Sequence, residues 1–207
     1  MTYQLTEYGI DRHMAANHFG HVVLTSKLLP LLKSTAEKGD KVRIVGFGSN
    51  LHQGTPSDCK FASLEELNQD LGPNANYGRS KLAVMLYCKY LSKHLPSNVL
   101  ANSVHPGIVE TKMSVEDIHE PYPVMGYMNS VVLNPFKKDN FQGAVSALFS
   151  ATKTEQTGQY VCPPAVPEVG SSLYVDEDGE LTENLMALTK KLLREKGDAS
   201  LGSIEFC

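Results

Sequence analysis

Two kinds of apolar pattern alternate along the chain, and this alternation limits the fold more than any other feature. Short apolar runs bounded by turn residues are typical of buried strands, and longer runs with helical spacing are typical of helices packed on a sheet. The expected order is helix (residues 12–38), strand (41–46), helix (77–95), strand (99–104), helix (139–152), strand (158–162) and helix (181–196). This order predicts an α/β fold with a parallel sheet.

Proline and capping residues set the limits of several elements. Pro30 lies inside the first helix, so a kink or a local break is expected there. Pro96 ends the helix over residues 77–95. The pattern Ser63-Leu-Glu-Glu66 has the form of a capping box and predicts one short helix near residues 63–68.

The composition is that of an ordinary globular domain and excludes several functions. With 207 residues, 42% of them apolar, the chain is expected to form a single domain. The formal net charge is −4 and there is no basic block, so no nucleic-acid partner is expected. No apolar run approaches the ~18 residues of a membrane helix, and the N-terminus has no signal-peptide pattern. A cytoplasmic protein without a membrane partner is therefore expected.

The cysteines and histidines suggest neither a disulfide framework nor a metal centre. The four cysteines lack C-x-x-C spacing, so they are expected to be reduced: Cys59, Cys88, Cys162 and Cys207. His18 and His21 are three residues apart on a predicted helix, but a third ligand is not near them in the sequence. The seven histidines are therefore interpreted as solvated or capping residues, and no metal is expected: His13, His18, His21, His52, His94, His105 and His119.

The most informative residues are Tyr77-Gly-Arg-Ser-Lys81. A tyrosine and a lysine four residues apart lie one turn apart on the same helix face. An ammonium group close to a phenol favours the phenolate, so Lys81 is expected to lower the pKa of Tyr77 from its ordinary value of about 10. The tyrosine could then act as a general acid or base near neutral pH. Alone, this spacing is a weak signal, because many surface helices carry it by chance.

Polar and turn residues follow both of the strands that flank this helix. Ser49 comes directly after the strand over residues 41–46, and His105-Pro-Gly107 follows the strand over residues 99–104. The carboxyl ends of parallel strands meet at one edge of an open α/β sheet, and ligands bind at that edge. The hydroxyl of Ser49 is therefore expected to hydrogen-bond a substrate oxygen there.

Taken together, these motifs resemble those of the short-chain dehydrogenase/reductase (SDR) family. The resemblance rests on Arg43-Ile-Val-Gly-Phe-Gly-Ser49, Tyr77-x-x-x-Lys81 and Pro106-Gly-x-Val-x-Thr111. A fourth motif resembles its retinol-dehydrogenase-like and fungal members: Asn17-His-Phe-Gly-His21 followed by Leu24-Thr and Leu28-Leu-Pro-Leu-Leu32. The resemblance covers nearly the whole chain, and four motifs in the right order make it specific. Gly46 and Gly48 depart from it, because the family usually has polar residues there.

The resemblance implies a Rossmann-like fold and an oxidoreductase that reduces a carbonyl or oxidises a secondary alcohol. Fungal specialised metabolism is one setting that it suggests. Tyr77 would be the proton donor or base, and Lys81 would lower its pKa. Ser49 would hold and polarise the substrate oxygen, and Asn17 would hold a water molecule of the proton relay.

The same resemblance implies NADP or NAD as the cofactor. Tyr77 and Lys81 would lie at the nicotinamide ribose, whereas the backbone of Val109 and the side chain of Thr111 would contact the nicotinamide carboxamide. Residues 108–135 would close over a small apolar carbonyl or alcohol substrate. Five side chains of this segment would suit such a substrate, although ordinary loop packing explains them equally well: Met113, Tyr122, Met125, Tyr127 and Met128.

The glycine-rich phosphate-binding loop of the family is absent from these 207 residues, as is its N-N-A-G motif. The first residues resemble the segment that follows N-N-A-G, so we expect an N-terminally truncated family member with about three strands of the sheet. The strand over residues 41–46 would then be an edge, which invites pairing with another chain. We expect one domain with a catalytic part (1–107), a substrate loop (108–135) and a C-terminal part (136–207).

Three interpretations remain open. The first is an NAD(P)-dependent oxidoreductase. The second is a non-catalytic relative that pairs with a longer family member, or with itself through the helices over residues 12–38 and 77–95. The third is a cofactor-free isomerase or lyase that uses Tyr77 and Lys81 as acid and base.

Overall fold

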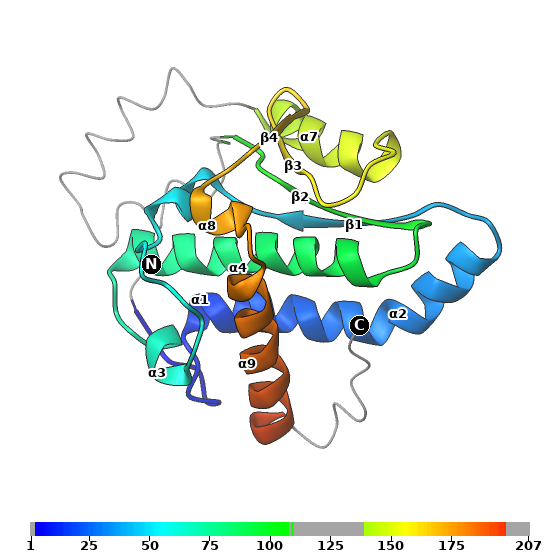
Figure 1. Ribbon diagram of the computed structural model, residues 1–207. Coiled ribbons are helices and arrows are strands. Elements are labelled where there is room, and N and C mark those ends of the chain that lie inside the picture. The colour runs from blue at the N-terminus through cyan, green and yellow to red at the C-terminus, as the bar shows by residue number, and fades with distance from the viewer. Residues whose placement is uncertain (1–2, 108, 110–138, 198–207) are drawn as a thin grey trace.

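The computed structural model describes residues 3–107, 109 and 139–197. A four-stranded sheet and the helices around it form the architecture (Figure 1). In chain order the elements are α1 (Arg12–Met14), η1 (Ala15–Phe19), α2 (Gly20–Glu37), β1 (Val42–Phe47), η2 (Asn50–Gly54), α3 (Leu64–Leu67), α4 (Pro73–His94), β2 (Val99–Val104), α7 (Asn140–Thr152), β3 (Tyr160–Cys162), β4 (Val166–Glu168), α8 (Ser172–Val175) and α9 (Glu180–Lys196). The predicted α/β class is confirmed.

The strands lie side by side in the order β1-β2-β3-β4. β1 pairs with β2 and β2 with β3 in parallel, as predicted, whereas β4 pairs with β3 in antiparallel orientation. Because β4 is a three-residue exposed strand with a proline at its centre, it has no apolar pattern from which it could be predicted. Within the described residues β1 is an edge strand of the sheet, as the sequence predicts for residues 41–46.

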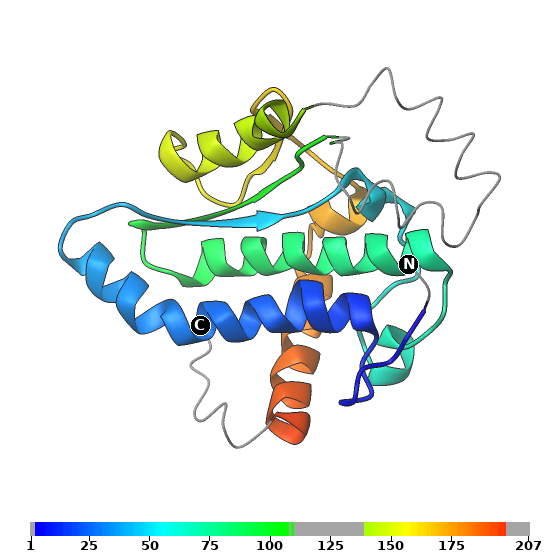
Figure 2. The ribbon, with the colours of Figure 1, turned by 180° about the vertical axis from the view of Figure 1, so that it is seen from behind.

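Helices cover both faces of the sheet. α7 lies on one face, and α4 and α2 lie on the other, as the two opposite views show (Figures 1 and 2). α4 is buried along most of its length, and β2 is buried at every residue. The central strand and the central helix therefore form the rigid frame to which the other elements attach.

The first helical segment differs from the prediction at two places. The expected irregularity is not at Pro30, because α2 continues through it as one helix. Pro30 has no amide hydrogen, so the carbonyl of the buried Ser26 loses its helical donor there, but the helix does not break. The irregularity lies at η1, a π-helical turn that joins α1 to α2 and contains Asn17. Such turns are frequent at functional sites and have no simple sequence signal.

The helix that carries Tyr77 begins four residues earlier than predicted. α4 starts at Pro73, which suits the first helical turn because proline lacks the amide donor that would be unpaired there. The short helix near residues 63–68 is confirmed as α3, and Ser63 accepts a hydrogen bond from the Glu66 amide at 3.2 Å. The other half of the expected capping box is replaced. The Glu66 carboxylate instead accepts three amide hydrogen bonds from residues 60–62, at 2.7–2.9 Å.

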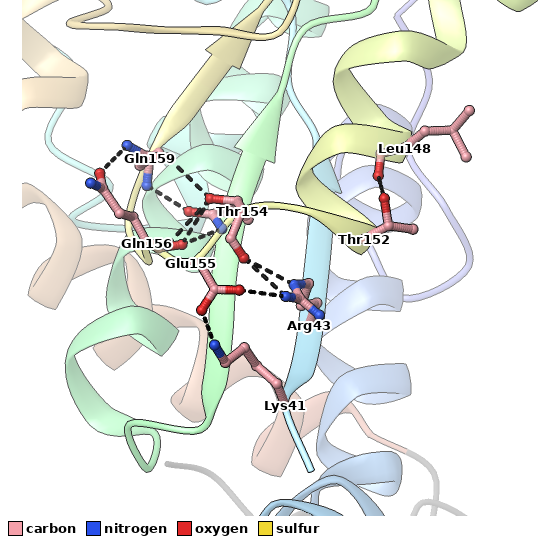
Figure 3. Close-up of polar contacts among 9 residues, drawn as sticks. Lys41, Arg43, Leu148, Thr152, Thr154, Glu155, Gln156 and Gln159 are labelled. Atoms are coloured by element: carbon pink, nitrogen blue, oxygen red, sulfur yellow. Dashed lines mark hydrogen bonds and ion pairs between the residues drawn. The ribbon is translucent and has the colours of Figure 1, made fainter.

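Ionic and polar contacts tie β1 to the connection between α7 and β3 (Figure 3). The guanidinium of Arg43 donates two hydrogen bonds to the Thr154 carbonyl, both at 3.1 Å, and lies 3.5 Å from Glu155. Lys41 also pairs with Glu155. Because Glu155 is largely exposed, these ion pairs contribute little to stability. Their effect is to fix the position of the loop beside the edge strand.

α9 packs across α4 and the start of the first helical segment (Figure 1). Leu185 and Leu192 are buried in the same apolar cluster as Phe19 and Leu86. α9 thus covers part of the α4 surface that the sequence assigns to a dimer partner. α2 still exposes an apolar stripe, with Leu24, Leu28 and Leu31 at 55%, 42% and 63% exposure. Self-association through these helices, or pairing with a longer relative, stays a prediction.

We expect the loss of the Arg79 guanidinium to destabilise the fold strongly. Arg79 is 1% exposed and donates to the carbonyls of Glu66, Leu67 and Gln69 at 2.6, 2.7 and 3.0 Å. Arg79→Met should lower the free energy of unfolding by about 3 kcal/mol, because these buried carbonyls lose their donor. Urea denaturation, monitored by circular dichroism, measures this change in the free energy of unfolding.

The matched control is Arg12→Met, which removes an exposed guanidinium that bonds only the Gln4 side chain among the contacts described, at 3.2 Å. Its effect should stay within about 0.5 kcal/mol. Equal losses in the two variants would contradict a special role for the Arg79 network.

Candidate active site

The site is built at the carboxyl ends of β1 and β2. The two strands run in register from the pair Val42 and Val99 to the pair Phe47 and Val104, and the Gly48 amide extends the ladder to the Val104 carbonyl at 2.8 Å. Ser49 follows in extended conformation and caps η2, since its hydroxyl accepts a hydrogen bond from the Leu51 amide at 3.2 Å. The strand ladder thus fixes the chain up to the residue before the serine.

Two glycines allow this segment to lie directly on α4. A Cβ at Gly48 would lie 2.8 Å from the Met85 side chain, and a Cβ at Gly78 would overlap the Leu51 carbonyl. Both glycines are buried. Gly48, which departs from the pattern of the resemblance, therefore fits a position where α4 comes very close. Gly78 adjoins Tyr77, so the same close approach brings Ser49 next to that tyrosine.

Three of the predicted catalytic side chains meet here. Ser49 and Tyr77 share a side-chain hydrogen bond. The ammonium of Lys81 lies 5.5 Å from the centre of the Tyr77 ring and donates to the Phe47 carbonyl at 3.0 Å. All three are only partly buried, so a ligand can reach them. The structure thus brings together the hydroxyl, phenol and ammonium groups that the sequence predicted.

The pKa of Tyr77 differs from the prediction. Burial raises the pKa of Tyr77 above its ordinary value of 10.0, and the hydrogen bond with Ser49 opposes that rise only in part. Burial also lowers the pKa of Lys81 from 10.5. The prediction that Lys81 lowers the tyrosine pKa is wrong for this state, because both groups lose hydration and the ammonium binds a carbonyl instead of the phenol oxygen. At neutral pH the phenol of Tyr77 is therefore protonated and can act as a proton donor.

Asn17 lies close to this group but contacts it indirectly. Its amide donates to the Ser80 hydroxyl at 2.9 Å, and that hydroxyl donates to the Tyr77 carbonyl at 2.7 Å. Asn17 thus connects the π-helical turn to the helix turn that carries Tyr77. The water molecule that the resemblance assigns to Asn17 stays a prediction.

The residues predicted to contact the nicotinamide are only partly described. Val109 is partly buried, and its side chain packs so closely on Gly143 at the start of α7 that a Cβ there would overlap it. Thr111 lies outside the described residues, as does most of the predicted substrate loop with its methionines and tyrosines. Their proposed contacts stay predictions.

The described histidines do not gather into a metal centre. In residues 3–107, 109 and 139–197 no group of three or more potential ligands was found. His18 is fully buried and shares a 2.7 Å hydrogen bond with Thr189 of α9. Burial, with repulsion from His21, lowers the pKa of His18 to about 3, so its imidazole is neutral. Cys59, Cys88 and Cys162 are buried free thiols.

His52 is a residue of the site that the sequence interpretation missed, since it was grouped with the solvated histidines. It is fully buried three residues after Ser49, and its ring contacts both the Ser49 carbonyl and the Ser171 amide. Its place three residues after the predicted serine was its signal in the sequence. Its partner Ser171 lies 119 residues further along the chain, so no local pattern could reveal this contact.

Several proteins of similar sequence are named as oxidoreductases or dehydrogenases. The chain is 50% identical over 204 residues to the Neurospora crassa protein bli-4, whose name describes it as a mitochondrial oxidoreductase. The chain is 36% identical over 159 residues to human retinol dehydrogenase 14. It is 31% identical over 211 residues to a short-chain dehydrogenase/reductase of Armillaria gallica. The chain belongs to the short-chain dehydrogenase/reductase family. No protein-family profile matches it.

The SDR relatives are longer than this chain. The aligned part covers 95% of this chain but 49% of the Neurospora protein, and 75% of this chain but 44% of human retinol dehydrogenase 14. The Armillaria SDR is covered to 64%. The chain thus spans about half the length of the first two relatives, and what those proteins do as a whole does not transfer directly.

A solved structure shows the same fold. An uncharacterized protein from Mycobacterium paratuberculosis superposes with a TM-score of 0.65 over 94% of this chain and 63% of its own, at 24% identity. At that identity the likeness shows the fold alone. In the part of this SDR chain that the structure describes, none of the helices has the length and apolar character needed to cross a bilayer.

We expect Tyr77 to titrate above 10.0, the ordinary value for a tyrosine, and Ser49→Ala to raise its pKa further. The sign follows from the two opposing causes: burial raises the pKa, and the substitution removes the hydrogen bond that lowers it. Each protein is titrated spectrophotometrically with and without the additional substitution Tyr77→Phe, and the difference between the two curves isolates the Tyr77 phenol. Circular dichroism checks that each variant is folded. A Tyr77 pKa below 10.0, or a decrease in Ser49→Ala, would contradict the geometry described.

Proposed function

We propose that this chain carries the catalytic part of an NAD(P)-dependent oxidoreductase that reduces an apolar carbonyl compound or oxidises the corresponding secondary alcohol. The observation that carries the proposal is the meeting of Ser49, Tyr77 and Lys81 at the carboxyl edge of the sheet. Parallel α/β sheets bind ligands at this edge. Membership of the SDR family supports an oxidoreductase, and the substrate stays a prediction.

The residues present fit one end of a nicotinamide cofactor. An ammonium group has three N–H donors, and within the described residues the Phe47 carbonyl accepts one from Lys81. As far as the described part of the chain shows, the two other donors of Lys81 are available for a pair of ribose hydroxyls. The phosphates of a dinucleotide commonly bind a glycine-rich turn, and these 207 residues contain no such motif. The fit therefore covers the nicotinamide ribose alone, with NADP or NAD as the candidate.

The chemistry of the chain's own residues follows from the hydrogen bond between Ser49 and Tyr77. Hydride chemistry would come from the bound cofactor. Ser49 would donate a hydrogen bond to the substrate oxygen and hold it beside the phenol. Tyr77 would give its proton to that oxygen in the reductive direction, and a partly buried phenol that is neutral near pH 7 is suited to this step. Lys81 would stabilise the phenolate that remains.

Cofactor titration of the 207-residue chain tests the proposal. We expect saturable binding of NADPH or NADH in the micromolar range, followed by fluorescence or calorimetry. Lys81→Met should weaken binding about tenfold or more, because a charged donor is lost. The matched control is Lys93→Met, which removes an exposed lysine from the far end of the same helix and should change nothing.

Two results would contradict the proposal. One is the absence of binding up to millimolar cofactor, since a dehydrogenase cannot act without its nucleotide. The other is binding that Lys81→Met leaves unchanged, because the nucleotide would then occupy a different place. The first result would favour the non-catalytic relative or the cofactor-free isomerase or lyase.

A further inference from the structure

His52 holds two opposite hydrogen bonds that fix its protonation state. Its Nε2 lies 3.1 Å from the Ser171 amide nitrogen, and its Nδ1 lies 2.6 Å from the Ser49 carbonyl oxygen. A backbone amide can only donate, so Nε2 must be the acceptor. A carbonyl can only accept, so Nδ1 must carry the proton. The geometry therefore requires one neutral tautomer.

The imidazole of His52 is enclosed by aromatic side chains. His52 is 0% exposed and lies edge-on to the rings of Tyr160 and Tyr174, with centroids 5.4 and 6.4 Å away. Gly170, at φ 78°, lies next to the ring on this side: a Cβ there would be 2.7 Å from the Tyr174 ring and in ordinary contact, at 3.5 Å, with Nε2. The titratable side chains seen against the ring in the described ranges are these two tyrosines, whose pKa values burial raises, so neither is charged near neutral pH.

The contacts join the Ser49 turn to a distant part of the chain. The Ser49 carbonyl accepts both the His52 amide, at 3.0 Å, and the His52 ring. Beside it, the Tyr160 hydroxyl donates to the Asn50 side chain at 3.0 Å. The segment that presents the Ser49 hydroxyl to Tyr77 is therefore held from behind by β3 and by the loop before α8.

We propose that His52 is a positioning residue that acts through Ser49. With its proton on Nδ1, it fixes the Ser49 carbonyl, and so the direction of the Ser49 hydroxyl towards Tyr77, and it couples that direction to the Gly170-Ser171 turn. The expected effect of His52 on turnover rests on the proposed function. Its expected effect on the pKa of the Tyr77 phenol does not, because that pKa can be measured without activity.

Two substitutions separate the two hydrogen bonds. In His52→Asn the side-chain amide can still donate near the position of Nδ1, whereas the acceptor for Ser171 is lost. In His52→Gln the longer side chain can accept from Ser171, whereas the donor to Ser49 is lost. Both variants remove the aromatic ring, so they lose the packing against Tyr160 and Tyr174 alike. Each is therefore the control for the other.

The primary readout is the titration of Tyr77, taken as the difference between each variant with and without Tyr77→Phe. We expect His52→Gln to raise the pKa of Tyr77 as Ser49→Ala does, and His52→Asn to leave it close to the wild-type value. If the chain turns over a carbonyl substrate, kcat should fall about tenfold or more in His52→Gln and remain near wild type in His52→Asn, with cofactor affinity unchanged in both.

An equal shift of the Tyr77 pKa in both variants, or no shift in either, would overturn the proposal and leave His52 as a packing residue. The melting temperature should fall by a similar amount in the two variants, because the lost packing is shared. A wild-type chain without turnover would count against the proposed function alone, since the titration still tests the positioning role.

Discussion

The end of β1 and the η2 turn lie against α4 with almost no side-chain layer between them. Gly48 and Gly78 make this contact possible, since a Cβ at either would meet Met85 or the Leu51 carbonyl. Interiors are close-packed, so a change of one methyl group at such a place must move a neighbour. The hydrogen bond between Ser49 and Tyr77 depends on this separation. The other features of the site follow from it, because Lys81 reaches the Phe47 carbonyl only when strand and helix are this close.

Buried polar groups then fix each partner of this contact. Behind α4, Arg79 holds the chain between α3 and α4 through backbone carbonyls, and this prevents the start of the helix from shifting. Behind η2, His52 holds Ser49 to the turn before α8. Both residues are buried and hydrogen-bonded to backbone groups, so they support the partly exposed groups that can meet a ligand.

The helices and strands with a local sequence pattern could be predicted from the sequence. Features that depend on contacts between distant parts of the chain could not. The seven long helices and strands are present because their apolar spacing or capping reflects burial against one sheet. Ser49, Tyr77 and Lys81 could be placed together because parallel strands end at one edge. The π-helical turn at Asn17 and the exposed strand β4 have no such pattern. The rise in the pKa of Tyr77 depends on burial by packed neighbours, and the contact of His52 with Ser171 depends on folding across 119 residues.

The most direct test of the central claim, that Tyr77 gives its proton to a substrate oxygen held by Ser49, is the oxidation of NADPH or NADH by the 207-residue chain with a series of apolar ketones and aldehydes. Wild-type turnover that falls about a hundredfold or more in Tyr77→Phe, measured for both proteins at saturating cofactor, is the expected result. Turnover that Tyr77→Phe leaves intact would contradict the claim, because the proton would then come from another group.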